Sequence, residues 1–348
     1  MASVQFKPKQ TTKRLLAVLP DRAREVLVKR YGLGTTTEKM TLDAIGKLYG
    51  ITRERVRQIE NYALANIRKS DAYKTEKTAF AELEGSLHTL GGIVVEEDFL
   101  GSHSKDVSLQ NHIHFILVIG DGFKKRKEDD EFKHRWHVND ELAKQVEDSL
   151  RKLYVGLSDE DILPESEIVQ KFLGHLENVS EKYKNQEIIR RWLSISKAIG
   201  KNAIGEWGAS NSSNIKTKGM RDYAFLVIRK HGSPIHFREV AKQITQVFKK
   251  KAHVATTHNE LIKDPRFVLV GRGLYALKEW GYMSGVVKDV IKKILEKNGP
   301  LTKDEIIEKV LKERYVKENT IMVNLQNQKF FKKDKEGRYH LTDTKVAA

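Results

Sequence analysis

The apolar residues of this chain recur at helical spacing in short stretches that polar turns separate. In the first clear stretch, Ala23, Val26, Leu27 and Tyr31 fall at positions i, i+3, i+4 and i+8, the spacing of one buried helix face. A polar loop follows, and the helical spacing then resumes. This pattern predicts an all-helical module at the N-terminal end of the chain.

Residues 41–69 predict a helix–turn–helix. Thr41 and Thr52 stand where N-caps are needed, and a threonine hydroxyl at an N-cap accepts a free backbone N–H. Gly50 lies at the turn between the two helices, where a backbone with positive φ is commonly required. We therefore expect the second helix to begin directly after Thr52.

The second helix of this motif has two different edges. Val56, Ile59, Ala63 and Ile67 recur every three or four residues and predict its buried side. The other edge is polar and carries four residues that suit contact with DNA base edges: Arg53, Glu54, Arg57 and Gln58. The apolar stripe is complete without them, so packing gives no reason for this polar edge.

Four later stretches repeat an outline of helices followed by a pair of short strands. Residues 123–127 and 132–138 flank an acidic turn, and residues 267–270 and 274–277 flank a glycine turn, as hairpins do. We predict a mainly α fold with small β-wings, built from tandem helix–turn–helix and winged-helix modules. The expected limits are 1–72, 75–155, 156–218 (winged-helix-like or a helical connector), 219–281 and 284–343.

Three details of these modules are specific predictions. Helical patterns run from 164 to 176 and from 185 to 199, and the Ser/Asn-rich residues 209–214 form a loop. Thr302 with Glu305 predicts a capping box. Large aromatic residues close the modules and are expected in their cores: Trp136, Trp207, Trp280 and Tyr339.

The formal net charge of +16 is unevenly distributed along the chain. Lys and Arg exceed Asp and Glu by nine in residues 1–70, by seven in 219–280 and by five in 281–348, whereas acidic residues exceed basic ones by five in 71–218. An even basic excess would indicate general attraction to polyanions. This distribution instead favours separate anion-binding modules around an acidic middle segment.

Several function classes lack their sequence signals. The chain has no cysteine, hence no disulfide, zinc ribbon or thiol chemistry, and it has no apolar run long enough to span a membrane. The histidines at 103, 112, 114, 134 and 137 do not share faces as metal ligands would, and no phosphate-binding glycine motif is present. We expect no enzymatic activity, cofactor, metal or small-molecule substrate, and a cytoplasmic, nucleoid-associated protein.

The N-terminal module closely resembles region 4 of the sigma-70 family of transcription initiation factors. The segments LPDRAREVLVKRYGL and TLDAIGKLYGITRERVRQIENYALANIRK carry the resemblance, over roughly residues 12–70. In that family this domain reads the −35 promoter element in the major groove and docks on the flap of the polymerase β subunit. By position, the resemblance implies base contacts by Arg53, Glu54, Arg57 and Gln58, and phosphate contacts by Thr52, Arg55, Arg68 and Lys69.

Residues 219–281 resemble a second family, the HARE-type winged helix–turn–helix. Pro234, His236 and Phe237 before the central helix carry the resemblance, together with the Gly-Arg-Gly-Leu-Tyr hairpin that starts at residue 271 and ends at Trp280. That family binds protein or DNA without catalysis. We expect Arg272, at the tip of the wing, to contact a DNA phosphate.

These observations predict a bacterial DNA-binding transcription regulator whose partners are double-stranded promoter DNA and the RNA polymerase core. Only about ten residues precede the region 4-like module, and nothing downstream resembles the domain that melts the −10 element. We therefore expect it not to be a complete sigma factor. Two alternatives stay open: a delta-like polymerase accessory subunit without sequence specificity, and the DNA-specificity component of a restriction or modification system.

Overall fold

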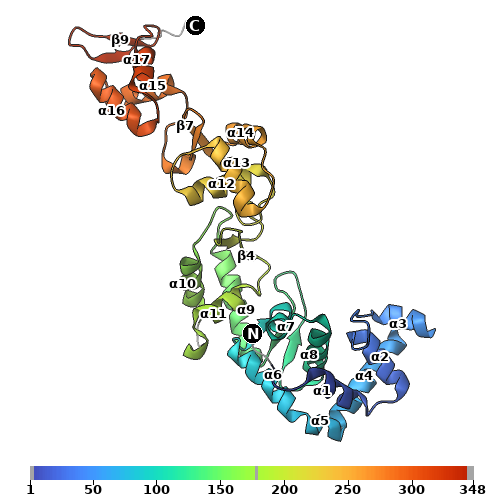
Figure 1. Cartoon of the computed structure of the whole chain (residues 1–348). Helices are drawn as coiled ribbons and strands as arrows, with labels where there is room; N and C mark the ends of the chain where they lie inside the picture. Colours follow the sequence, from blue (N-terminus) through green and yellow to red (C-terminus); the bar gives the residue numbers. More distant parts are fainter. Residues whose placement is uncertain (1–3, 177–178, 343–348) are drawn as a thin grey trace. The chain divides into compact units, whose positions relative to one another are not determined.

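The computed structural model describes residues 4–176 and 179–342 of the chain (Figure 1). It is mainly helical, with 56% of residues in helices, and its strands form small two- and three-stranded antiparallel sheets. This confirms the predicted fold class. The chain divides into two compact units, one of residues 1–201 with 207–211 and one of residues 202–206 with 212–348.

The first unit opens with eight helices interrupted by one short strand. They are α1 (Pro8–Leu16), α2 (Asp21–Tyr31), α3 (Leu42–Tyr49), α4 (Arg53–Lys69), α5 (Asp71–Thr75), α6 (Lys77–Thr89), β1 (Ile93–Val95), α7 (Glu96–His103) and α8 (Val107–Ile119). The predicted caps are confirmed: the hydroxyl of Thr41 accepts the N–H of Ala44, that of Thr52 accepts the N–H of Arg55, and Gly50 has φ of 64°. The helix–turn–helix therefore consists of α3 and α4.

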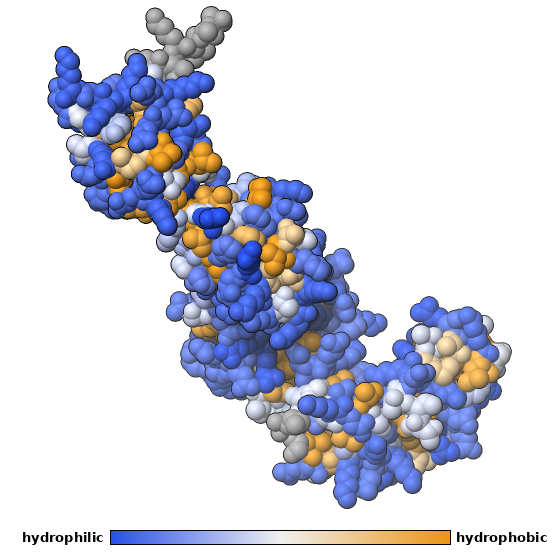
Figure 2. Space-filling view, turned by 45° about the horizontal axis from the view of Figure 1, so that its top comes forward, coloured by the Kyte–Doolittle hydropathy of each residue, from blue (hydrophilic) through white to orange (hydrophobic). Residues whose placement is uncertain are grey.

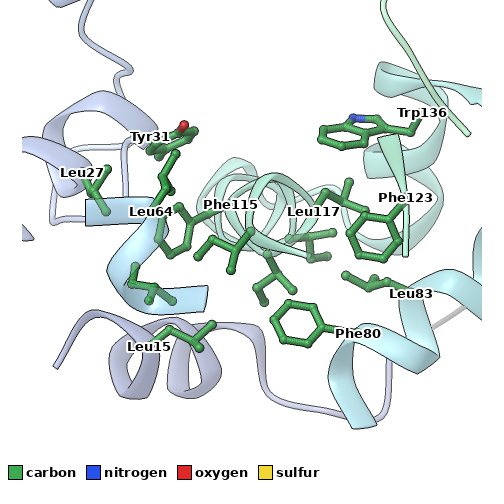
Figure 3. Close-up of a cluster of buried hydrophobic side chains, with 14 of the residues drawn as sticks. Leu15, Leu27, Tyr31, Leu64, Phe80, Leu83, Phe115, Leu117, Phe123 and Trp136 are labelled. Atoms are coloured by element: carbon green, nitrogen blue, oxygen red, sulfur yellow. The ribbon is translucent and has the colours of Figure 1, made fainter. Parts of the chain in front are cut away.

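One hydrophobic core joins the predicted first and second modules, and α8 lies at its centre. Figure 3 shows Phe115 and Leu117 of α8 between side chains of α1, α2 and α4 on one side and side chains of α6 and the β-hairpin on the other. The chain between residues 72 and 75 continues directly from α4 through α5 into α6. The predicted boundary between residues 72 and 75 therefore falls between helices that share one core. The division of the chain into modules stays a prediction.

A second core in the same unit uses the next part of the chain. Its elements are α9 (Asp140–Val155), α10 (Glu165–His175), η1 (Glu181–Tyr183), α11 (Gln186–Leu193), β4 (Ile199–Lys201) and β5 (Trp207–Ala209). Strands β2 (Lys124–Arg126) and β3 (Arg135–His137) form the hairpin that pairs with β1, and Trp136 of β3 packs into the first core. Strand β1 belongs to both cores because side chains alternate across a strand. Val94 packs into the core around α8, whereas Ile93 and Val95 pack into the second core.

The helix predicted for residues 185–199 is too long. Helix α11 ends at Leu193, and the following segment pairs with the hairpin loop through the N–H of Lys133 to the carbonyl of Ile195 (3.0 Å) and the N–H of Lys197 to the carbonyl of Glu131 (2.8 Å). The Ser196 hydroxyl accepts the N–H of Ala198. Pairing with a distant segment thus replaces the helix that the local pattern favours.

The second unit contains two groups of helices, each with a small sheet. Its elements are α12 (Met220–His231), β6 (Ile235–His236), α13 (Phe237–Phe248), α14 (Val254–Lys263), β7 (Phe267–Gly271), β8 (Leu274–Leu277), η2 (Lys278–Trp280), α15 (Val287–Asn298), α16 (Lys303–Glu313), α17 (Glu318–Leu325), β9 (Phe331–Lys333) and β10 (Tyr339–Leu341). The sheets have the strand orders β6-β8-β7 and β10-β9. The Thr302–Glu305 capping box is confirmed at the start of α16.

The aromatic residues that close the modules divide into two classes. Trp136 and Trp207 are buried, as predicted, but Trp280 and Tyr339 are only half-buried. Trp280 lies in the short η2 segment and packs against the edge of a small cluster, and Tyr339 lies in the last hairpin beside a larger one. The prediction that they are core residues is wrong for these two: Trp280 follows β8 in the short η2 segment, and the strand that carries Tyr339 is only half-buried along its length.

Every helix within the described ranges falls short of the length and apolarity that crossing a membrane requires. Figure 2 shows that the visible face of the molecule is mostly hydrophilic, with apolar side chains in separate patches.

Truncation of Phe115 tests whether the core around α8 joins the first two modules. Phe115 is fully buried, and its ring centroid lies 5.2 Å from that of Tyr31 in α2. We expect Phe115→Ala to lower the free energy of unfolding by about 3–5 kcal/mol, because it leaves a cavity among several helices. Urea unfolding followed by circular dichroism measures this loss.

The matched control is Val155→Ala, at a side chain that is 84% exposed at the end of α9. It should change the free energy of unfolding by less than about 0.5 kcal/mol. If Phe115→Ala were equally mild, the shared core would not hold these helices together.

Candidate nucleic-acid interface

Helix α4 presents the predicted polar edge to solvent. Val56, Ala63 and Ile67 are fully buried, which confirms them as its packed side, and Ile59 is half-buried. Four side chains of the opposite edge are exposed: Arg53, Glu54, Arg57 and Gln58. These side chains carry hydrogen-bond donors and acceptors that can pair with the base edges exposed in the major groove of DNA.

Side chains along the polar edge form hydrogen bonds with neighbouring side chains of the same helix. Arg57 donates two hydrogen bonds to the carboxylate of Glu54, at 2.9 and 2.6 Å, and Arg55 donates one to Oε1 of Gln58 at 3.1 Å. The hydrogen bond from Arg57 holds the pKa of Glu54 below its usual range, and the Glu54 carboxylate raises the pKa of Arg57. Both groups therefore stay charged near neutral pH, and exposed pairs of this kind are readily exchanged for other partners.

The turn between α3 and α4 passes close to the backbone of α3 beside this edge. A Cβ on Gly46 would lie 2.7 Å from the carbonyl oxygen of Ile51, so α3 carries a glycine where the turn passes. A shallow groove of about 560 Å³ follows the turn, and Lys47, Thr52 and Arg55 are among its lining residues. Because the N-terminus of a helix favours anions, Thr52 and Arg55 are well placed for a phosphate.

The other predicted phosphate contacts lie elsewhere. Arg68 and Lys69 end α4, about 24 Å along the helix axis from Arg53 at 1.5 Å per residue. Arg68 donates to the backbone carbonyls of Ile119 (2.9 Å) and Val118 (2.8 Å), so its guanidinium closes the C-terminal end of α8. Lys69 is exposed. The structure thus separates Arg68 and Lys69 from Thr52 and Arg55, and the phosphate contacts stay predictions.

Arg272 belongs to the second unit and is exposed in the turn between β7 and β8. The neighbouring Gly273 has φ of 75°, and a Cβ there would lie 2.6 Å from Nε2 of His236, so the turn needs glycine at this position. The wing tip is therefore tightly packed beside an exposed guanidinium.

No group of three or more His, Cys, Asp or Glu is arranged to hold a metal ion within the described residues.

A buried polar contact that the sequence did not reveal fixes the orientation of α4. The hydroxyl of Tyr31 in α2 donates to Oε1 of Glu60 in α4 at 2.8 Å, and Nε of Arg30 forms an ion pair with the same oxygen at 3.5 Å. Glu60 occupies the packed side of α4 between Val56 and Ala63. A carboxylate at such a position is a signal of a buried partner, because an unpaired charge there would be costly.

The comparisons with known proteins concern this N-terminal module. The family model for Sigma-70, region 4 matches residues 15–69. The RNA polymerase sigma factor RpoS of Coxiella burnetii (strain RSA 493 / Nine Mile phase I) is 54% identical over 55 residues, which are 16% of this chain and 15% of that protein. The RNA polymerase principal sigma factor HrdD of Streptomyces griseus is 42% identical over 55 residues, 16% of each chain.

The chain thus matches about one sixth of the length of these curated relatives. The matched residues contain α2, α3 and α4, so residues 15–69 form a sigma-70 region 4 helix–turn–helix, a DNA-binding module. The match ends at residue 69. The resemblance of residues 219–281 to the HARE-type domain stays a prediction.

Alkaline pH tests the contact between Tyr31 and Glu60. Burial, and then the Glu60 carboxylate, raise the pKa of Tyr31 well above its ordinary value. A tyrosine in the unfolded chain ionises near pH 10, so the stabilisation is complete below about pH 10 and is lost as the pH rises further. Tyr31→Phe should lower the free energy of unfolding by about 1–3 kcal/mol at neutral pH, and its decline above pH 10 should be shallower than in the wild type.

Urea unfolding between pH 7 and 11 measures both effects. Burial, and then hydrogen bonding, also raise the pKa values of Tyr49 and Tyr73 to about 12, so the difference between variants isolates Tyr31. Tyr62→Phe, at an exposed tyrosine of α4, is the matched control and should keep the steep decline. Identical pH profiles for Tyr31→Phe and the wild type would contradict this account.

Proposed function

We propose that the protein is a non-enzymatic transcription regulator that recognises −35-like promoter DNA through α4 and docks on bacterial RNA polymerase. One observation carries the proposal: the exposed polar edge of α4 lies in a module that matches sigma-70 region 4. The named relatives are RNA polymerase sigma factors. The match covers only one module of these relatives, so it does not support the activity of a whole sigma factor for this chain. We therefore propose a role in regulation.

The geometry of α4 suits direct reading of bases. Arg53 and Arg57 carry guanidinium groups that can donate to O6 and N7 of guanine, and Glu54 can accept from the N4 amino group of cytosine. The bond between Arg57 and Glu54 holds both side chains on the exposed edge before DNA binds. On binding, each exchanges its partner for a base edge, and the side chains need little further ordering.

The rest of the chain supports a regulatory role with more than one contact. The region 4 module shares its core with α6, α7 and α8, so it is built into a larger unit instead of being attached by a linker. The middle segment, residues 71–218, has an acidic balance that suits contact with protein better than contact with DNA. The basic winged modules of the second unit, with Arg272 at one wing tip, would add phosphate contacts.

A polymerase accessory subunit without sequence specificity is the second candidate, and the acidic middle segment favours it. The two candidates differ in one property. A regulator selects a DNA sequence by itself, whereas an accessory subunit co-purifies with core polymerase and selects none. A restriction or modification specificity component would instead require a partner nuclease or methyltransferase.

Substitution of Arg57 tests the reading role of α4. In the full chain, Arg57→Ala should lower the affinity for the preferred duplex roughly tenfold to a hundredfold relative to a scrambled duplex, because one bidentate base contact is lost. Fluorescence anisotropy with both duplexes measures this ratio. The duplex is first obtained by selection from random DNA with the wild-type protein.

Arg191→Ala is the matched control. Arg191 pairs with Glu187 on the surface of α11, much as Arg57 pairs with Glu54, but it lies outside the region 4 module. This control should leave both affinities unchanged. Equal loss of affinity for both duplexes in Arg57→Ala would assign Arg57 to phosphate contact and contradict its reading role.

Salt dependence tests whether several basic contacts hold the DNA. Each phosphate that Lys or Arg neutralises releases counterions, so the logarithm of the association constant falls linearly with the logarithm of salt concentration. We expect a drop of roughly a hundredfold or more between 50 and 200 mM salt for the full chain. Anisotropy titrations across this range provide the measurement, and an unchanged affinity would exclude this mode of binding.

A further inference from the structure

A groove of about 550 Å³ lies on the first unit, away from the polar edge of α4. Its walls come from α1, α2 with the segment that follows it, and the start of α8. Leu16, Ala17 and Leu33 give it an apolar part. Elements of the region 4 module and of the module that follows it therefore meet around one hollow.

Cationic side chains surround this groove. Lys9, Lys13 and Arg24 all line it. Arg24 pairs with Asp21 on its own helix, and Lys9 is 3.9 Å from Asp106, a distance that leaves it weakly held. Lys13 has no ion-pair partner among the described residues. The groove therefore has an excess of cationic side chains, and Ser108, in the first turn of α8, lines it beside the carboxylate of Asp106 that caps this helix.

Two buried polar side chains in the wall have a bonding atom that the described residues leave without a partner. Thr12 is 1% exposed and its Oγ1 lacks a hydrogen-bond partner, and His112 is 7% exposed and its Nδ1 lacks one. The adjacent Thr11 shows the contrast, because its hydroxyl donates to Glu76 at 2.9 Å. Buried polar atoms are usually satisfied, so two unsatisfied ones in the wall of a basic groove point to a ligand.

We propose that this groove binds a small molecule that carries a phosphate group. Lys13 and Lys9 would supply charge, and the hydroxyl of Ser108 would supply a hydrogen bond. The buried hydroxyl of Thr12 would supply a second one by turning toward the groove. The apolar part beside Leu16 and Leu33 has room for a compact non-polar portion of the ligand. Burial, and then the charge of Lys9, lower the pKa of His112, so its imidazole is neutral near pH 7 and offers one N–H donor.

Binding there would stabilise the contact between α1, α2 and α8. A ligand that binds only the folded protein raises its stability in proportion to the logarithm of ligand concentration. Tyr31 of α2 is hydrogen-bonded to Glu60 of α4. A ligand that stabilises the position of α2 would therefore also stabilise the position of α4. The proposal does not depend on the identity of the DNA that α4 reads.

Thermal unfolding of the full chain with inorganic phosphate and with adenosine 5′-monophosphate tests the proposal, at ionic strength matched with sodium chloride. We expect the unfolding midpoint to rise as either probe is added, by roughly 5–10 °C at a hundredfold excess over Kd. Isothermal titration calorimetry gives the affinity. Lys13→Ala should weaken it about tenfold and Thr12→Val about threefold to tenfold.

Thr12→Val separates a ligand-binding role from a structural one. It replaces an unpartnered hydroxyl by a methyl group of the same shape, so the unfolding midpoint without ligand should be unchanged or higher. A lower midpoint without ligand, with unchanged phosphate affinity, would assign Thr12 to the core and overturn the proposal. Lys105→Ala removes an exposed charge near the start of α8 but outside the groove, and it should leave phosphate affinity unchanged.

A duplex DNA titration distinguishes the two sources of a phosphate. The proposal predicts that Lys13→Ala and Thr12→Val bind duplex DNA as the wild type does. If neither probe shifts the midpoint while Lys13→Ala weakens duplex binding, the groove holds the DNA backbone and the small-molecule proposal fails. It fails equally if both probes bind all variants alike, because binding would then not involve this groove.

Discussion

The burial of α8 on all sides is the constraint on which the first unit depends. An apolar helix that is buried all round needs packing partners on every face. In this protein α1, α2 and α4 cover one side of α8, and α6, α7 and the hairpin that contains Trp136 cover the other. The region 4 module is therefore complete only as part of this larger core, whereas α3 and the start of α4 pack on α2 through a small cluster whose buried residues are Val26, Ile45 and Val56.

This arrangement explains why α4 can present a polar edge without loss of order. Tyr31 and Glu60 tie its middle to α2, and Arg68 ties its last turn to the carbonyl end of α8. The side chains of Arg53, Glu54, Arg57 and Gln58 are exposed, and the hydrogen bonds on this edge join Arg57 to Glu54 and Arg55 to Gln58. A rigid helix with replaceable surface pairs is a suitable device for reading bases, because the ordering of the backbone precedes binding.

Local signals in the sequence were sufficient for much of the fold and part of the site. Thr41, Thr52 and Gly50 mark the helix–turn–helix because caps and left-handed turns depend on single residues. Contacts between distant segments were less accessible. The segment after Leu193 has a helical pattern in the sequence but pairs with residues 131–133 in the structure. Arg68 resembles a surface cation by position, yet it donates to the last carbonyls of α8, about fifty residues away in the chain. The basic groove at Thr12 and His112 depends on three elements meeting and has no local signal at all.

Selection from random duplex DNA by the full chain, with and without core RNA polymerase, shows whether α4 reads a DNA sequence. We expect the protein alone to enrich one short motif, with guanine or cytosine at positions whose enrichment disappears in Glu54→Ala and Arg57→Ala. Polymerase should sharpen the same motif. Failure to enrich any sequence, in either condition, would contradict the claim that α4 reads promoter DNA.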